Sequence, residues 1–171
     1  MPRIRLITER TDARTDGQRA VYDAVTASRG SMIRPFEVLA HVPALAAPLS
    51  DVGAGIRFGG SIPDHDRELV ILTAALRHGC EFEWNSHVGI ARSAGVREEA
   101  LTYLRTGDGE MTAHEELIIG FVRELSDTSS VGDERFAALA AEFGEAGVVE
   151  LATTVGYYTL LAFVMGTVHA C

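Results

Sequence analysis

The sequence contains few of the features expected of a secreted, disulfide-stabilised or membrane-spanning protein. It has only two cysteines, Cys80 and Cys171, and two residues so far apart do not form the dense disulfide framework of a small secreted domain. We therefore expect both to be thiols. No stretch approaches about 18 uncharged apolar residues, and the N-terminal stretch MPRIRLITERTD lacks the apolar run of a signal peptide. These absences predict a cytoplasmic protein.

An excess of positive charge is also absent. The chain has 15 Lys and Arg residues against 24 Asp and Glu residues, which gives a formal net charge of −9 at pH 7. An acidic chain is not attracted to nucleic acid or to an anionic membrane surface, so we expect neither as a partner. The expected ligand is a small molecule, and an anionic one would need a local cluster of arginines.

The residues that are present are typical of a globular protein. A chain of 171 residues can bury a core without disulfides or metal, and its 47% hydrophobic and 23% charged content is ordinary for such a protein. No repeat, low-complexity segment or linker divides the sequence. We predict a single domain over residues 1–171, with an N-terminal extension at 1–15.

Capping residues, prolines and glycines mark a series of helices. Thr15 with Gln18 and Thr112 with Glu115 have the spacing of capping boxes, and Asp64 is a candidate cap for another helix. The predicted helices cover about residues 16–28, 35–41, 43–59, 64–78, 80–94, 97–106, 113–126, 133–144 and 145–168. No pair of alternating apolar runs is joined by a hairpin dipeptide, so strand signals are weak. The predicted fold class is all-α, a helical bundle.

The last predicted helix, about residues 145–168, is almost wholly apolar. A helix that is apolar on all sides must be buried in the bundle, in a subunit interface or in both. We therefore predict a homo-oligomer, as a dimer, trimer or hexamer.

The stretch CEFEWNSH, residues 80–87, places several reactive groups close together. On a helix, Cys80, Glu83 and His87 share one face, because residues three and four apart are neighbours. That face continues with apolar residues, as expected of a helix that lines a buried site. A surface ion pair between Glu83 and His87, with Cys80 and Trp84 as core residues, is the alternative. Glu68 lies on the preceding predicted helix, and spacing alone does not place it against His87.

Residues 67–101, RELVILTAALRHGCEFEWNSHVGIARSAGVREEAL, resemble the core of the carboxymuconolactone decarboxylase family, which includes the AhpD-like alkylhydroperoxidases. The matching pieces are the Arg-Glu pair at 67–68, FEWNSH at 82–87 and the A-x-x-A-G-V pattern that ends at residue 96. VELATTVGYYTLLAFVMG, residues 149–166, resembles another helix of this family. The resemblance implies an AhpD-like helical bundle, with a family core over about 35–125 and the C-terminal apolar helix at about 145–168.

The resemblance implies two different chemistries. In the peroxidase branch a glutamate precedes C-x-x-C, and a histidine follows the second cysteine by four residues. Glu68, Cys80 and His87 match three of these positions, but Glu83 replaces the second cysteine. A two-cysteine cycle would therefore need Cys171, while a one-cysteine peroxidase that uses an external thiol stays open.

The FEWNSH form resembles the decarboxylase side of the family instead. There His87 would transfer a proton to or from a substrate carbon, because its unperturbed pKa lies near neutrality. Glu83 would orient the imidazole, and Glu68 would be its partner or a second proton carrier. Decarboxylation or isomerisation of a small cyclic or conjugated carbonyl compound is the leading prediction. A thiol peroxidase built on Cys80 and a non-catalytic ligand-binding relative are the alternatives.

Four side chains are candidates for holding the substrate. Arg77 or Arg92 would bind a substrate carboxylate, although arginines on helices are commonly exposed. Trp84 and Tyr157 would line the pocket, and core packing is the alternative role for both.

No metal or other cofactor is predicted. Glu68, Glu83 and His87 are possible ligands, but E-x-x-x-H is not the E-x-x-H element of di-iron bundles, and only one such element is present. The remaining histidines have no mutual spacing that suggests a site: His41, His65, His78, His114 and His169.

Overall fold

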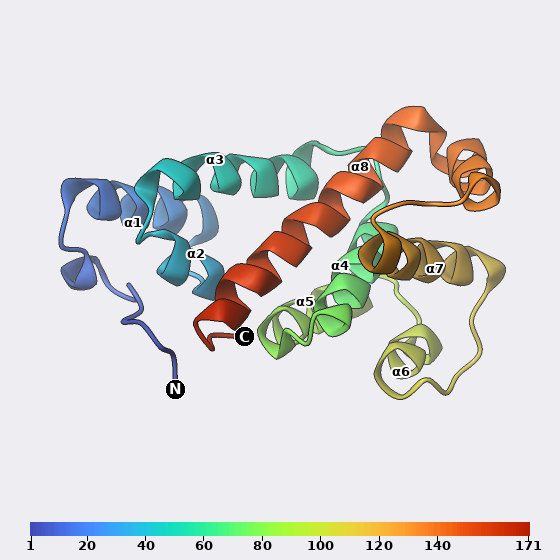
Figure 1. Ribbon diagram of the computed structural model, residues 1–171, viewed down its shortest axis with the longest axis horizontal. Helices are drawn as coiled ribbons and strands as arrows, with labels where there is room; N and C mark the ends of the chain where they lie inside the picture. Colours follow the sequence, from blue (N-terminus) through green and yellow to red (C-terminus); the bar gives the residue numbers. More distant parts are fainter. The chain divides into compact units, whose positions relative to one another are not determined.

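A computed structural model describes all 171 residues of the chain and confirms the all-α fold class (Figure 1). The chain forms two compact units. The first consists of residues 1–59 together with 163–171, and the second of residues 60–162. The single-domain organisation stays a prediction.

The first unit contains the N-terminal helices. After a short 3₁₀ turn, η1 (Arg10–Asp12), come α1 (Asp16–Arg29), α2 (Arg34–Leu39) and α3 (Pro43–Ala54), and α3 continues into a π-helical turn, η2 (Gly55–Gly59). The predicted capping box begins α1, because the Thr15 side chain accepts from the Gln18 amide and Gln18 reaches back. Gly30 ends α1 at φ 81°, a left-handed conformation that suits glycine. Helix α3 packs against both α1 and α2.

The second unit is built around α4 (Asp64–Arg77), which packs against α5 (Glu81–Ala94), α6 (Glu98–Thr106) and α7 (Ala113–Thr128). Because three helices cover it, α4 buries polar as well as apolar side chains. Its buried residues are Asp66, Glu68, Leu69, Val70, Ile71, Leu72, Thr73, Ala74 and Ala75. Buried carboxylates in such a helix need partners, and their partners define the sites of this unit.

The long helix α8 (Asp133–Thr167) bends at Gly144, whose φ of 69° and ψ of 171° are not helical. The two helices predicted on either side of this glycine are therefore confirmed. Glu150 of α8 accepts hydrogen bonds from the Ser61 and Ile62 amides at 2.8 and 3.2 Å, which fixes the segment before α4. The prediction that no stretch approaches the length and apolarity of a membrane span is wrong, because by length and composition α8 could cross a membrane. Half of its most apolar window is buried within the protein, and the core helix of a soluble protein passes the same test.

The predicted helix boundaries agree with the structure to within two or three residues, and one predicted cap is wrong. Asp64 is the first helical residue of α4 rather than its cap; Pro63 occupies the capping position. The Asp64 carboxylate instead pairs with Arg67 one turn later, at 2.9 Å.

Candidate functional site

The candidate site is formed where α4 and α5 pack against each other. Gly79 adopts φ 64° between the two helices, and the Cys80 amide donates to the Ala75 carbonyl at 2.8 Å to close the turn. Glu68 lies 11 residues before Gly79, and His87 lies 8 residues after it. The packing of the two helices therefore brings together residues that spacing alone could not pair.

Glu68 and His87 form a buried hydrogen bond. His87 Nδ1 lies 2.7 Å from Glu68 Oε2, and the two side chains are 8% and 1% exposed. An ionised carboxylate can only accept, so the hydrogen of this bond belongs to Nδ1. With Nδ1 protonated, Nε2 of a neutral His87 carries the lone pair that a general base requires.

The Nε2 side of His87 faces a phenol and a second carboxylate. Tyr158 Oη lies 3.5 Å from Nε2 and Glu83 Oε2 lies 3.7 Å from it. The Tyr158 ring meets the imidazole edge-on, with centroids 5.3 Å apart. Both side chains are buried. One imidazole thus has a fixed nitrogen held by Glu68 and a second nitrogen next to two groups that can exchange protons.

Tyr158 is the member of this cluster that was not predicted; the prediction was the neighbouring Tyr157. Tyr157 packs edge-on against the Tyr158 ring, with centroids 5.4 Å apart, and so supports the phenol next to His87. Both tyrosines lie on one helix in adjacent positions, and only the rotation of α8 decides which of them reaches the imidazole.

Arg67 is a second residue near this cluster that had no predicted role. Its Nε lies 3.8 Å from Glu68 Oε1, and the side chain is 11% exposed. Nε makes no hydrogen bond, so it acts on Glu68 through charge alone. The Arg67 guanidinium therefore places a positive charge behind the carboxylate that holds Nδ1.

The two arginines predicted to bind substrate have carboxylate partners elsewhere. Arg77 Nε donates to Asp127 at 2.6 Å, and Arg92 Nε donates to Glu98 at 2.6 Å. All four side chains are at least partly exposed. Either arginine would have to leave its carboxylate partner to bind a substrate carboxylate, so this role stays a prediction.

Trp84 is buried, and the guanidinium of Arg105 lies 4.6 Å above its ring centroid. Arg105 also makes two hydrogen bonds to Glu81, at 2.7 and 2.8 Å. Trp84 is thus covered by a cation–π contact, as expected of a core residue at the edge of α5.

Cys80 is completely buried in the position before the first turn of α5. The structure contains no free cysteine, so the expectation that both cysteines are thiols is wrong for the state it represents. A buried sulfur that is not a thiol cannot attack a peroxide without prior reduction.

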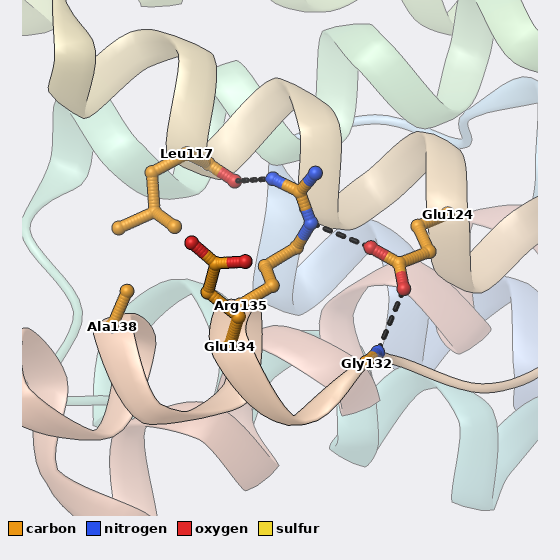
Figure 2. Close-up of a pocket in the computed structure, with 6 residues that line it drawn as sticks. All are labelled: Leu117, Glu124, Gly132, Glu134, Arg135 and Ala138. Atoms are coloured by element: carbon orange, nitrogen blue, oxygen red, sulfur yellow. Dashed lines mark hydrogen bonds and ion pairs between the residues drawn. The ribbon is translucent and has the colours of Figure 1, made fainter.

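The cavity in Figure 2, about 410 Å³ in volume, lies between α7 and α8 and contains a different set of residues. Arg135 donates to Glu124 at 2.6 Å, and Glu124 also accepts from the Gly132 amide at 2.7 Å. The Arg135 guanidinium holds the pKa of Glu124 below its ordinary value. Arg135, Glu124 and the Gly132 amide thus hold one another, and the cavity contains no histidine or cysteine.

Residues 43–111 match the model of the carboxymuconolactone decarboxylase family. No curated protein matches the chain. These matched residues include Glu68, Cys80, Glu83 and His87, and they confirm the resemblance described above.

Three solved structures share the fold. An AhpD-core, peroxidase-related protein from Ralstonia eutropha JMP134 has a TM-score of 0.79 at 16% identity, and the alignment covers 100% of this chain and 93% of that one. A peroxidase-related protein from Silicibacter sp. TM1040 has a TM-score of 0.76 at 12% identity, with 98% and 90% covered. A protein of unknown function from Agrobacterium tumefaciens has a TM-score of 0.65 at 18% identity, with 78% and 93% covered. At these identities the similarity shows the fold alone.

Proposed function

We propose that this chain, which belongs over residues 43–111 to the carboxymuconolactone decarboxylase family, is an acid–base enzyme whose proton carrier is His87. The observation that carries the proposal is the buried 2.7 Å hydrogen bond between His87 Nδ1 and Glu68. It fixes the tautomer and leaves Nε2 as the reactive nitrogen. The substrate class is a small cyclic or conjugated carbonyl compound, handled without a cofactor.

The proton balance of such a reaction suits this arrangement. In a decarboxylation, the bond to CO₂ breaks and its electron pair enters the conjugated system. The imidazolium form of His87 then gives its Nε2 proton to carbon and regains one from solvent. In an isomerisation, neutral Nε2 removes a proton from the carbon next to the carbonyl and returns it elsewhere. In both cases ionised Glu68 stabilises the imidazolium.

Glu83 and Tyr158 would act on the other side of the imidazole. The Tyr158 hydroxyl can donate a hydrogen bond to a substrate oxygen on which negative charge develops. Glu83 can accept a proton or stabilise the cationic imidazole. Two carboxylates beside one histidine allow one to stay ionised while the other exchanges protons.

The experiment uses His87→Gln and a panel of small conjugated lactones and keto acids. Turnover is followed by CO₂ release, and proton transfer by exchange of the hydrogens next to the carbonyl in D₂O, measured by NMR. We expect His87→Gln to lower the rate by about 100-fold or more, whereas His41→Gln, which alters an exposed histidine of the other unit, keeps the wild-type rate. Full activity of His87→Gln on a substrate that the wild type turns over would contradict the proposal.

A thiol peroxidase is the second candidate, because two proteins with this fold are described as peroxidase-related. In that reaction the reduced Cys80 thiolate attacks the O–O bond, forms a sulfenic acid and releases an alcohol. An external thiol or the Cys171 thiol then reacts with the sulfenic acid, which gives a disulfide and water.

Reduced protein should therefore be treated with a hydroperoxide and its intact mass measured. One added oxygen on Cys80, or rapid formation of a Cys80–Cys171 bridge, supports the peroxidase. A thiol that reacts no faster than free cysteine contradicts it. A chain that fails both assays but binds a small carbonyl compound is a non-catalytic relative.

A further inference from the structure

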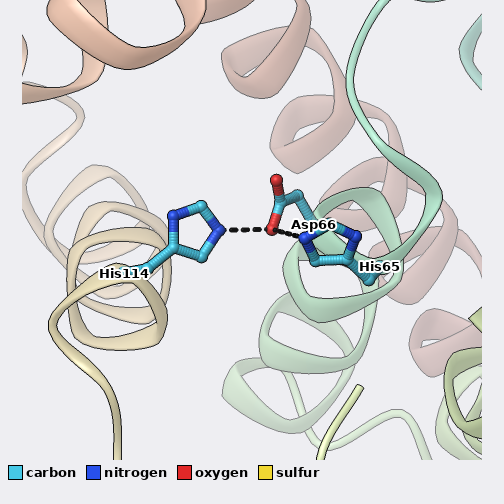
Figure 3. A group of neighbouring side chains, drawn as sticks. All are labelled: His65, Asp66 and His114. Atoms are coloured by element: carbon cyan, nitrogen blue, oxygen red, sulfur yellow. Dashed lines mark hydrogen bonds and ion pairs between the residues drawn. The ribbon is translucent and has the colours of Figure 1, made fainter. Parts of the chain in front are cut away.

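A second cluster of ligating side chains lies at the beginning of α4 and α7, outside the Glu68–His87 pair. His65 and Asp66 are in the first turn of α4, and His114 is in the first turn of α7 (Figure 3). Asp66 is 2% exposed, while the side chains of His65 and His114 are 48% and 33% exposed. The cluster thus has a buried carboxylate at its base and two partly exposed imidazoles above it.

Both histidines direct the same nitrogen at the same oxygen. His114 Nε2 lies 2.6 Å from Asp66 Oδ1, and His65 Nε2 lies 3.1 Å from it. The carboxylate oxygen sits between the two rings in Figure 3. One ligand atom from each residue falls within 4.8 Å of the other two. Two imidazole nitrogens, one from each helix, thus meet at a single buried carboxylate oxygen.

Glu142 of α8 holds the other nitrogen of His114. Its Oε1 lies 2.5 Å from Nδ1, and since a carboxylate can only accept, Nδ1 carries the hydrogen of this bond. Nε2 then faces Asp66, which is also an acceptor. Either a hydrogen or a metal ion can therefore lie between Nε2 and Asp66. A carboxylate on the outer nitrogen is the usual way in which a metal-binding histidine is oriented.

We propose that His65, Asp66 and His114 bind one divalent transition-metal ion, with Glu142 as the residue that orients His114. Two imidazoles and one carboxylate are the ligand set of sites that bind Zn²⁺ or Fe²⁺ and leave further positions open to water or substrate. Metal–ligand bonds of about 2.1 Å place neighbouring ligand atoms about 3.0–3.4 Å apart. The His65–Asp66 distance already fits, and the His114–Asp66 distance needs to open by about half an ångström.

The site is separate from the proposed reaction centre. Asp66 and Glu68 are two residues apart on α4 and so point to different sides of the helix. Glu68 contacts His87, whereas Asp66 contacts His65 and His114. Binding of an ion at the second cluster can therefore be measured without a substrate and without turnover.

The test is a titration of chelator-treated protein with Co²⁺ alone, followed by its visible absorption, and with Zn²⁺ alone in competition with a chromogenic chelator. We expect one ion per chain, bound through nitrogen and oxygen ligands. His65→Gln and His114→Gln should each weaken binding by more than 100-fold, and Glu142→Gln by about 10- to 100-fold. His41→Gln is the matched control and should bind like the wild type, as should His87→Gln.

Two results would overturn the proposal. One is the absence of stoichiometric Co²⁺ or Zn²⁺ binding to folded wild-type protein. The other is equal loss of binding in His41→Gln and His114→Gln. Circular dichroism of each variant verifies folding. Glu142 is exposed, so Glu142→Gln should fold and remains informative if a variant of His65 or His114 does not. Loss of activity in His87→Gln with metal binding intact would separate the two proposals.

Discussion

His87 Nδ1 is hydrogen-bonded to Glu68 Oε2 at 2.7 Å, with both side chains buried between helices that follow each other in the chain. The Arg67 guanidinium lies 3.8 Å behind Glu68, and Tyr158 and Glu83 lie on the far side of the imidazole. The row runs from a cation through a carboxylate and an imidazole to a phenol. Within this row, the hydrogen bond from Nδ1 to Glu68 is the contact that fixes the orientation of the imidazole.

Glu68→Gln tests the orienting role of the carboxylate. The amide has nearly the same shape but no charge, so it neither stabilises the imidazolium nor fixes the hydrogen on Nδ1. We expect kcat to fall at least about tenfold while KM changes little. Glu81→Gln, which removes an exposed carboxylate paired with Arg105, is the control. Equal activity of the two variants would argue against the pair as a catalytic unit.

Tyr158→Phe removes one hydroxyl next to Nε2 and keeps the ring packed. If this hydroxyl donates to the substrate, turnover should fall by about tenfold or more. Tyr157→Phe is the matched variant in the neighbouring position, and we expect it to keep most of the activity. Steady-state rates of the two variants give the comparison of activity, and thermal unfolding of both shows whether their stability has changed. A larger loss of turnover in Tyr157→Phe than in Tyr158→Phe would contradict the proposed role of the Tyr158 hydroxyl.

The helices could be predicted from the sequence because their signals are local. The Thr15 and Thr112 capping boxes act within one turn, and the structure places both as predicted. The glycines Gly30 and Gly95 end their helices in left-handed conformations, which is also a local effect. Gly144 separates two helical segments for the same reason, since its φ of 69° interrupts the helix.

The partners within each site could not be predicted, because they depend on packing between helices. Glu68 meets His87 only through the register of α4 against α5. The choice of Tyr158 over Tyr157 depends on the rotation of α8. His65 and His114 are far apart in the sequence and converge only because α4 and α7 begin at the same end of the second unit, so no spacing rule links them.

His78 provides a pH-dependent contribution to stability. Burial, together with the adjacent Arg77 charge, lowers its pKa below the ordinary value, while Thr159 Oγ1 lies 3.0 Å from its Nε2. Because the folded pKa is depressed, the unfolded chain binds more protons between the two pKa values. The contribution of His78 to the unfolding free energy is therefore fully present above the pKa of the unfolded chain, about 6.5. It is lost as the pH falls through the lower pKa of His78 in the folded protein.

The measurement is urea unfolding of the wild type and of His78→Gln from neutral pH to pH about 5. The variant should lose less of its unfolding free energy over this range. His41→Gln is the control and should follow the wild type. If the unfolding free energies of wild type and His78→Gln change in parallel with pH, His78 does not cause the pH dependence.

Self-association through α8 remains a proposal that the exposed residues of this helix support. Val149 is 66% exposed and Leu160 is 36% exposed, and their spacing places them on one side of the helix. Val149→Arg should shift the protein to a smaller species in light scattering coupled to size exclusion. Ala141→Arg adds the same charge to an exposed position before the bend and should leave the mass unchanged. A wild type that is monomeric at high concentration would contradict the homo-oligomer.

The most direct test is the tautomer of His87, read from nitrogen NMR of protein labelled with ¹⁵N-histidine, at a pH where a free histidine is neutral. The hydrogen bond to Glu68 predicts a protonated Nδ1 and an unprotonated Nε2, and it predicts that Glu68→Gln weakens this preference. His87→Gln identifies the signal by its loss. A His87 that carries its hydrogen on Nε2, in wild type and Glu68→Gln alike, would contradict the claim that Glu68 prepares this histidine as the proton carrier.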